Sequence, residues 1–195
     1  GERTVVLPID TLQLRGVHNL ENVAAAMAAA TAAGVSATSL AVAAHEFQPL
    51  PNRLEEVGIV NGVTFVNDSY ATAPLPTIAA LTSFGGPIVL ILGGQGKGAD
   101  YTALVTTIRS STVRAVVCYG EEGLRFHSLL TDQSLKRQNM YERSFDTAVK
   151  RAASIAEPGE LVLLSPAATS YDQFRNATER GIRFRELVAE VQHGA

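Results

Sequence analysis

Three predominantly apolar runs constrain the fold of this chain more than any other feature. They lie at residues 88–92, 113–119 and 161–164, and helix-like stretches separate them. Runs without polar alternation are typical of strands that are buried on both faces, and strands that alternate with helices favour parallel pairing with right-handed crossovers. The sequence therefore predicts an α/β fold: a Rossmann-like, mostly parallel sheet with helices on both faces.

Weaker signals complete the predicted order of elements. A hairpin with Asn61-Gly62 at its tip precedes the first apolar run, and a weak strand is expected near 139–141. Helices are expected near 75–83, 101–109, 123–131, 145–156 and 172–191. Ahead of the hairpin we expect short strands at 4–7 and 12–14 and helices at 20–33 and 37–45. The proline-containing stretch after residue 46 breaks this pattern, so we expect one domain to span 1–46 and a second to span 47–195.

Composition narrows the classes of function. The chain is 46% hydrophobic and 18% charged with a net charge of −3, which suits a buried core and argues against nucleic acid as a partner. Cys118 is the single cysteine, expected to be a buried hydrophobe in a cytoplasmic protein. No segment reads as a signal peptide or membrane span, so no membrane partner is expected. Because the chain opens directly in a strand-like segment, it reads as a piece of a larger protein.

Four polar loops each follow a predicted strand directly, at 67–72, 93–100, 119–123 and 165–170. Ligands of open α/β sheets bind beyond the carboxyl ends of the strands, so these loops are expected to share one edge. In the last loop Ser165, Thr169 and Ser170 would lie beside the N-terminus of a helix beginning at Asp172, an arrangement suited to an anion.

The loop at 93–100 is rich in glycine and holds Lys97, but it lacks the spacing and ending of a P-loop. It is either a tight connection or an anion site. Asp68, at a strand end, suits a ribose contact, whereas Ser69 or Thr72 could simply cap the next helix. Arg53 could reach a phosphate or pair with Glu55.

Two further sets of polar residues have simple structural explanations. His18, Asn19 and Asn22 could form the polar first turn of a helix. The other histidines, at positions 45, 127 and 193, have no neighbours at metal-ligand spacing, so no metal site is expected.

Five ordered motifs resemble those of the Mur ligases, and most of all the glutamate-adding type. They are Gly16-Val-His-Asn-Leu-Glu-Asn22, Leu50-Pro-Asn-Arg53, Asn67-Asp-Ser-Tyr-Ala-Thr72, Gly93-Gly-Gln-Gly-Lys-Gly-Ala-Asp100 and Ser165-Pro-Ala-Ala-Thr-Ser-Tyr-Asp-Gln-Phe174. The resemblance implies that residues 1–46 are the tail end of a central ATP-binding domain and 47–195 a C-terminal Mur ligase domain.

That resemblance implies an ATP-dependent amide ligase of peptidoglycan synthesis. Such an enzyme adds glutamate, D-glutamate in the common type, to UDP-N-acetylmuramoyl-L-alanine through an acyl phosphate, with Mg²⁺ neutralising charge. The phosphate loop and most Mg²⁺ ligands would lie in N-terminal and central domains outside this chain. The active site would then be incomplete here, and the isolated chain inactive.

The resemblance also assigns roles residue by residue. It places Asn19 and Asn22 near adenine, Arg53 and Asp68 at the phosphate and ribose side of ATP, and Thr72, Lys97 and Ser170 at the glutamate carboxylates. Three positions depart from the usual motifs: Tyr70 replaces a lysine near glutamate, Asn52 replaces a histidine, and Ala177 replaces an aromatic residue.

Those departures leave alternatives open for the amino acid that is added, and they do not affect the residues expected to contact ATP. Tyr70 belongs to the expected glutamate pocket, so the changed pocket could mark a variant that adds L-glutamate. Another amide ligase of the superfamily, or a non-catalytic nucleotide-binding module, are the remaining alternatives.

Overall fold

The computed structural model of the protein describes residues 8–14, 16–131 and 138–194. It divides into two units, residues 1–50 and 51–195, each of which is described by itself. The sequence predicted a domain boundary after residue 46, and the structure divides into its two units between Leu50 and Pro51.

The first unit contains a 3₁₀ turn, η1 (Ile9–Thr11), and two helices, α1 (Val17–Ala32) and α2 (Ala37–Glu46). Gly34, with φ of 89°, follows the end of α1, and the Ser36 hydroxyl accepts from the Ser39 N–H to cap α2. The predicted strand at 12–14 is wrong, because the N–H of Leu12 closes the 3₁₀ turn on the Ile9 carbonyl. The strand predicted at 4–7 lies outside the described residues.

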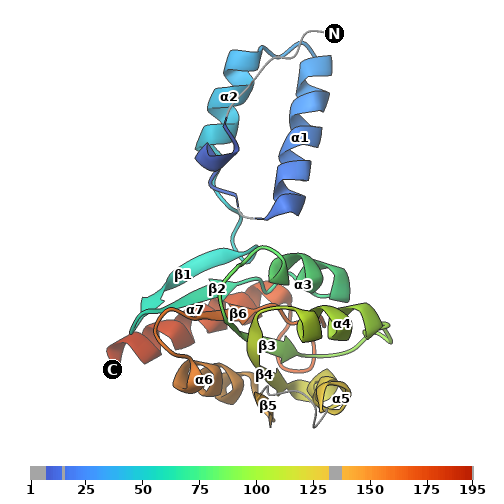
Figure 1. Ribbon diagram of the computed structural model, residues 1–195, viewed down its shortest axis with the longest axis vertical. Helices are drawn as coiled ribbons and strands as arrows, with labels where there is room; N and C mark the ends of the chain where they lie inside the picture. The colour runs from blue at the N-terminus through green and yellow to red at the C-terminus, as the bar shows by residue number, and fades with distance from the viewer. Residues whose placement is uncertain (1–7, 15, 132–137, 195) are drawn as a thin grey trace. The chain divides into compact units, whose positions relative to one another are not determined.

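A six-stranded sheet forms the second unit, in the order β1-β2-β6-β3-β4-β5 (Figure 1). Its strands are β1 (Glu55–Val60), β2 (Val63–Asn67), β3 (Ile88–Gly93), β4 (Val113–Tyr119), β5 (Gln138–Glu142) and β6 (Leu161–Leu164). β1 pairs antiparallel with β2, and every other pairing is parallel. The predicted mostly parallel α/β sheet is confirmed.

The β1–β2 hairpin turns where the sequence predicted. Asn61 and Gly62 have φ values of 51° and 78°, as a two-residue type I′ turn requires. Asparagine tolerates this left-handed conformation better than most residues and glycine adopts it freely, so these two residues fix the hairpin register at Val60 opposite Val63.

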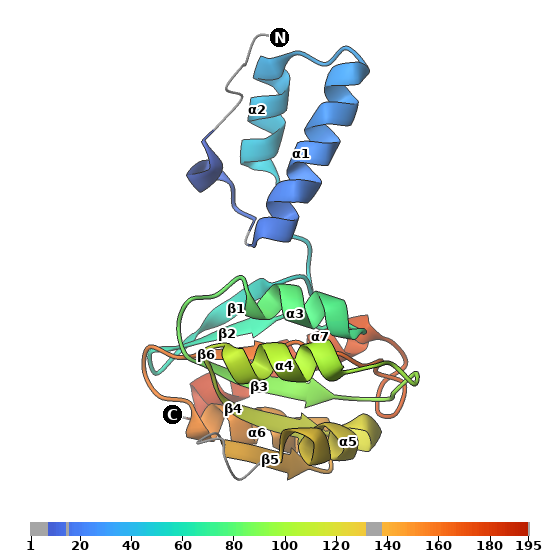
Figure 2. The same ribbon diagram turned by 45° about the vertical axis from the view of Figure 1, so that its right-hand side comes forward.

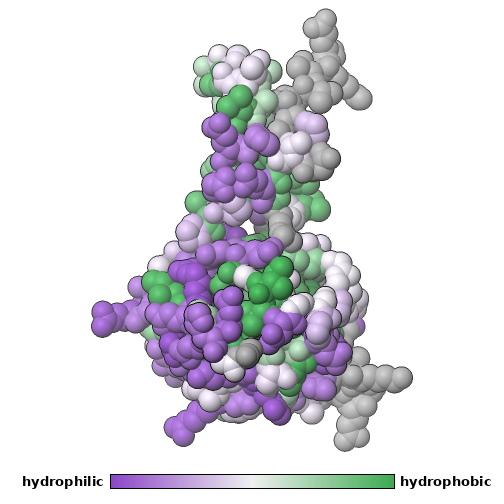
Figure 3. Space-filling model, turned by 90° about the vertical axis from the view of Figure 1, so that its left-hand side faces the viewer, coloured by the Kyte–Doolittle hydropathy of each residue, from purple (hydrophilic) through white to green (hydrophobic). Residues whose placement is uncertain are grey.

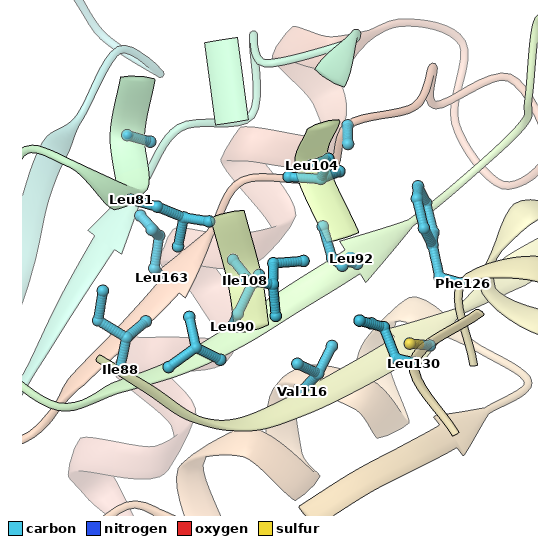
Figure 4. Close-up of a cluster of buried hydrophobic side chains, with 14 of the residues drawn as sticks. Leu81, Ile88, Leu90, Leu92, Leu104, Ile108, Val116, Phe126, Leu130 and Leu163 are labelled. Atoms are coloured by element: carbon cyan, nitrogen blue, oxygen red, sulfur yellow. The ribbon is translucent and has the colours of Figure 1, made fainter. Parts of the chain in front are cut away.

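Helices cover both faces of the sheet, also as predicted (Figure 2). One face carries α3 (Pro74–Leu81), α4 (Thr102–Ser110) and α5 (Gly120–Leu130), and the other carries α6 (Phe145–Ile155) and α7 (Ala177–His193). Figure 4 shows the first layer, where Leu90 and Leu92 of β3 meet Leu104, Ile108 and Phe126. The second layer packs Phe145 and Phe184 against the opposite side chains of the same strands. Two buried layers thereby hold the strand ends in place.

Two helix starts differ from prediction. α5 begins at Gly120 rather than 123, and α7 begins at Ala177 rather than 172. Residues 171–176 form turns, in which the N–H groups of Gln173 and Phe174 donate to the Ser170 carbonyl, and Asn176 then caps α7. The expectation that Ser165, Thr169 and Ser170 lie at the N-terminus of a helix beginning at Asp172 is therefore wrong.

On the face of the second unit that Figure 3 shows, most residues are hydrophilic, and an apolar patch lies among them. Ion pairs join helices α6 and α7: Arg183 contacts Asp146 at 2.6 Å, and Lys150 contacts Glu190 at 3.3 Å. Among the described residues no helix combines the length and the apolar character needed to cross a membrane.

Candidate ligand-binding site

The loops after β2, β3, β4 and β6 meet at one edge of the sheet, because these four strands run parallel. Gln95 and Thr169 exchange two backbone hydrogen bonds, N to O, of 2.8 and 3.0 Å. The N–H of Glu122 donates to the Gly94 carbonyl at 2.8 Å. The prediction of a shared loop edge is confirmed, and backbone hydrogen bonds hold its parts together.

Asp68 lies at the end of β2 with only 4% of its surface exposed. Its carboxylate accepts from the Ser165 hydroxyl at 2.8 Å and from the Leu54 N–H at 3.4 Å. Burial raises the pKa of Asp68 to about 6, although these hydrogen bonds and the nearby Arg53 and Arg180 act against the shift. A carboxylate can accept about four hydrogen bonds, so Asp68 keeps capacity for a further donor.

Arg180 of α7 is completely buried beneath this edge. Its guanidinium donates to the Ser69 carbonyl at 2.8 Å, to the Ser69 hydroxyl at 3.0 Å, and to the Tyr119 hydroxyl at 3.1 Å. Two more bonds of 3.2 Å reach the Ala168 carbonyl. One side chain thus joins the ends of β2 and β4 to the loop after β6.

Arg53 is exposed on a turn with unusual backbone geometry. Its neighbours Asn52 and Leu54 have φ values of 62° and 45°, a region that non-glycine residues seldom occupy. The alternative that Arg53 pairs with Glu55 is not what the structure shows. Glu55 instead pairs with Arg185 at 2.8 Å, and the Arg53 guanidinium carbon lies 5.4 Å from the centre of the Tyr70 ring.

The glycine-rich loop at 93–100 is closely packed at its start. A Cβ on Gly94 would lie 2.0 Å from the Thr169 carbonyl oxygen, and one on Gly96 would lie 1.8 Å from a Glu122 carboxylate oxygen. Asp100 ends the loop by accepting from the N–H and the hydroxyl of Thr102 at the start of α4. The loop is therefore a tight connection, and it presents the exposed Lys97 at the shared edge.

Three other predicted residues lie in the same loops. Ser170 is 2% exposed, and Thr72 and Tyr70 are half-buried. The Tyr70 hydroxyl lies 2.8 Å from the Thr178 hydroxyl on α7. Capping of α3 by Ser69 or Thr72 is wrong, because Ala73 is the N-cap and Ser69 donates to the Ala177 carbonyl instead.

Asn19 and Asn22 belong to the first unit, on the first turns of α1, and an amide–amide hydrogen bond of 3.4 Å joins them. Gly16 is the N-cap of α1. The described part of the chain contains no cluster of three or more metal-ligating side chains. Cys118 is fully buried, as expected, and burial raises the pKa of its thiol.

Residues 52–168 match the family described as "Mur ligase, glutamate ligase domain". The match spans more than half of the chain and contains three of the four loops at the shared edge, together with most of the fourth. The chain belongs to this Mur ligase family, and it carries the family's glutamate ligase domain.

Curated relatives narrow the similarity further. The chain is 41% identical over 194 residues to the UDP-N-acetylmuramoylalanine--D-glutamate ligase of Pelotomaculum thermopropionicum, covering 100% of this chain and 42% of that protein. It is also 41% identical to the ligase of the same name from Hahella chejuensis, covering 94% of this chain and 41% of that protein. The chain thus spans about two fifths of the length of these relatives.

Solved structures share the fold at low sequence identity. UDP-N-acetylmuramate-alanine ligase from Thermotoga maritima matches with a TM-score of 0.67 at 16% identity, over 92% of this chain and 39% of that one. The MurF ligase of the same organism, in complex with ADP, matches with a TM-score of 0.66 at 17% identity, over 92% and 40%. These structures confirm the fold of a Mur ligase C-terminal region.

Sequence reasoning missed Arg180 and the polar network around Asn52. A signal for Arg180 exists, because it precedes Phe184 and Leu187 by four and seven positions and so shares the apolar face of α7. Gly181 beside it is a second signal: a Cβ there would lie 1.8 Å from the Asn52 side-chain oxygen. A glycine inside a helix indicates a close approach of this kind.

Proposed function

We propose that this chain forms the C-terminal part of an ATP-dependent amide ligase that adds glutamate to UDP-N-acetylmuramoyl-L-alanine. The observation that carries the proposal is the joining of four strand-end loops at one edge by Arg180 and by the Gln95–Thr169 pairing. This edge gathers hydroxyl, cationic and carboxylate groups from loops that are far apart in the sequence. The names of the relatives support glutamate and UDP-N-acetylmuramoylalanine as substrates.

On the glutamate side we assign Lys97, Thr72 and Ser170. A glutamate carries two carboxylates, which require a cation and several hydrogen-bond donors converging on them. Lys97 is an exposed ammonium on a short glycine-rich loop, while Thr72 and Ser170 come from loops that Arg180 holds together. The three residues therefore supply a charge and two hydroxyls from a rigid base.

On the ATP side we assign Arg53 and Asp68, with Asn19 and Asn22 near adenine. Arg53 presents an exposed guanidinium, which suits a phosphate, and Asp68 retains acceptor capacity for a ribose hydroxyl. When bound, ATP supplies the phosphoryl group that activates the carboxylate of UDP-N-acetylmuramoyl-L-alanine, and Mg²⁺ neutralises the charge that develops. We place no Mg²⁺ ligand on this chain.

Phosphate release tests this proposal directly. The full-length protein that carries this chain is assayed with ATP, Mg²⁺ and UDP-N-acetylmuramoyl-L-alanine, once with D-glutamate and once with L-glutamate. Turnover that depends on one isomer supports the ligase and identifies the acceptor amino acid. Phosphate release that needs neither isomer, or no release at all, contradicts the proposal.

A matched substitution separates the site from the rest of the surface. Lys150 on α6 is also an exposed lysine, but its ion pair is with Glu190 on α7 rather than at the shared edge. Lys150→Ala is expected to leave turnover within twofold of the parent, because an exposed ion pair contributes little. Equal losses for Lys97→Ala and Lys150→Ala would contradict the assignment of the edge.

A further inference from the structure

Two departures from the Mur ligase motifs, Asn52 and Tyr70, both lie next to Arg53, whose side chain is exposed. Asn52 precedes Arg53 in the sequence, and the Tyr70 ring lies beneath the Arg53 guanidinium. We therefore looked at what holds this arginine in place.

The backbone on the N-terminal side of Arg53 is fixed by a polar network. The N–H of Asn52 donates to a Glu55 carboxylate oxygen at 2.8 Å. The side-chain oxygen of Asn52 accepts from Asn67 at 3.0 Å and from Arg185 at 3.2 Å. Asparagine is among the non-glycine residues that tolerate a positive φ best, so this residue suits both the turn and the network.

The backbone on the C-terminal side is fixed as well. Leu54 is buried, has φ of 45°, and donates its N–H to Asp68. A non-glycine residue holds this conformation only where its surroundings enforce it, and such backbone strain concentrates at functional sites. The backbone that carries Arg53 is therefore fixed on both sides, although its side chain remains exposed.

Tyr70 contacts the side chain of Arg53 directly. Its ring centre lies 5.4 Å from the guanidinium carbon, within the range of a cation–π interaction. Tyr70 is itself anchored by two hydrogen bonds. The Tyr70 backbone N–H donates to the Asn52 carbonyl at 3.2 Å, and the Tyr70 hydroxyl is hydrogen-bonded to the Thr178 hydroxyl at 2.8 Å.

We propose that Tyr70 is a positioning residue for Arg53, with its anchored ring holding the arginine guanidinium toward the nucleotide, and that it does not contact the acceptor amino acid. This inference rests on the proposed function, and it moves Tyr70 from the glutamate side, where the motif comparison put it, to the ATP side. A lysine at this position would bring a second cation close to Arg53 and could offer no aromatic face.

The first test compares Tyr70→Leu with Tyr70→Phe in the full-length ligase. Tyr70→Leu is expected to raise KM for ATP about two- to fivefold, the size of an exposed cation–π interaction, and to leave KM for glutamate unchanged. Tyr70→Phe keeps the ring, so its KM for ATP is expected to stay close to that of the parent. A larger effect of Tyr70→Leu on glutamate than on ATP would overturn the proposal.

A double-mutant cycle shows whether Tyr70 acts through Arg53. In an Arg53→Ala background, Tyr70→Leu is expected to have no further effect on KM for ATP. If the two substitutions multiply independently, Tyr70 does not act through the arginine and the proposal fails. Thr178→Val serves as the control for losing the hydroxyl contact alone, and it is expected to match Tyr70→Phe.

A spectroscopic test needs no turnover and therefore stands apart from the proposed function. In the 195-residue chain, the NMR signal of the Arg53 side-chain Nε–H is expected to carry a ring-current shift. The shift should vanish in Tyr70→Leu and persist in Tyr70→Phe, and an unchanged signal in Tyr70→Leu would overturn the proposal. If the shift vanishes in Tyr70→Leu as expected but the unsubstituted full-length protein has no ligase activity, only the ligase assignment fails.

Discussion

Buried charged side chains have different partners at the two ends of the parallel strands. At the end where the strands begin, here called the amino edge, Arg114 of β4 forms a bidentate ion pair with Glu160, with nitrogen–oxygen distances of 2.5 and 2.6 Å. At the carboxyl edge, Arg180 is more deeply buried, and in the described part of the chain its hydrogen bonds go to neutral carbonyls and hydroxyls.

The difference separates a structural ion pair from the edge that we propose binds substrates. A charge that is paired within the protein offers little attraction to an outside ion, whereas a cation on neutral acceptors leaves a positive field around it. The carboxylates at the two edges also have opposite pKa shifts, although at Asp68 the cause is burial, and the nearby Arg180 acts against it. Arg114 lowers the pKa of Glu160, whereas burial raises the pKa of Asp68 to about 6.

Replacing Arg180 is expected to have the largest effect. Arg180→Met leaves the carbonyls of Ser69 and Ala168 and the Tyr119 hydroxyl without their donor, and each buried polar group left unpaired costs about 1–3 kcal/mol. We expect the free energy of unfolding to fall by about 3–5 kcal/mol, measured by urea denaturation.

Arg183 on the same helix is the matched control for that substitution. It forms ion pairs with Asp146 and Glu186 near the surface, so Arg183→Met is expected to cost about 1 kcal/mol or less. Similar losses for the two variants would show that Arg180 is an ordinary surface cation and would remove the contrast between the edges.

Asp68→Asn is expected to change the pH dependence of stability by about 2–3 kcal/mol. The folded-state pKa of Asp68, about 6, lies above its usual value of 3.8, so the folded protein binds more protons between these values. The wild-type carboxyl therefore lowers stability as the pH rises from about 4 to about 6. The asparagine variant lacks this loss, and its stability relative to the parent should increase from pH 4 to pH 7.

Urea unfolding of both proteins at pH 4, 5, 6 and 7 measures this difference. Ser165→Ala is the companion variant, because it removes the hydroxyl that stabilises the ionised carboxylate at 2.8 Å. It is expected to raise the pKa of Asp68 further and so steepen the loss. A constant difference between Asp68→Asn and the parent would mean that Asp68 titrates normally.

Lys97→Ala is expected to raise KM for glutamate about tenfold or more, the value of a charge-assisted hydrogen bond. The KM for ATP should stay within twofold, since Lys97 is assigned to the acceptor. Steady-state kinetics of the full-length ligase with each substrate varied in turn gives both constants. An equal rise in both would move Lys97 away from the glutamate side.

The smallest effect is expected at the amino edge. Replacing the Arg114–Glu160 pair as a whole, by Arg114→Met with Glu160→Gln, is expected to change the free energy of unfolding by about 1 kcal/mol or less. Arg114→Met alone leaves the carboxylate without its ion-pair partner and should cost more. A double variant as unstable as Arg180→Met would show that the two edges do not differ.

The sequence was sufficient for the layers of the fold, because a parallel sheet needs long apolar runs and these are visible in any single sequence. The Asn61-Gly62 turn was equally plain, since its type I′ geometry favours these two residues. Predictions failed where short-range hydrogen bonds replaced regular structure, as in the turns that delay α7 to Ala177.

The candidate site was only partly predictable. The loops and their shared edge followed from strand direction, and the roles of individual residues came from the resemblance to Mur ligases. Arg180 could not be distinguished from a surface cation by composition, and the stacking of Arg53 on Tyr70 depends on a turn whose positive φ values occur at Asn52 and Leu54. Both features come from tertiary packing that overrides local propensity.

The strand order also has a consequence for the sequence of events during folding. β2 pairs with β6, the last strand of the chain, so the Asp68–Ser165 contact spans 97 positions and the Ser69–Arg180 contact spans 111. Contacts between residues so distant along the chain carry a large loop-closure cost and form late. During synthesis, both strands of the β3–β4 pair are available early, whereas the edge where the four loops meet cannot be completed until α7 has been synthesised.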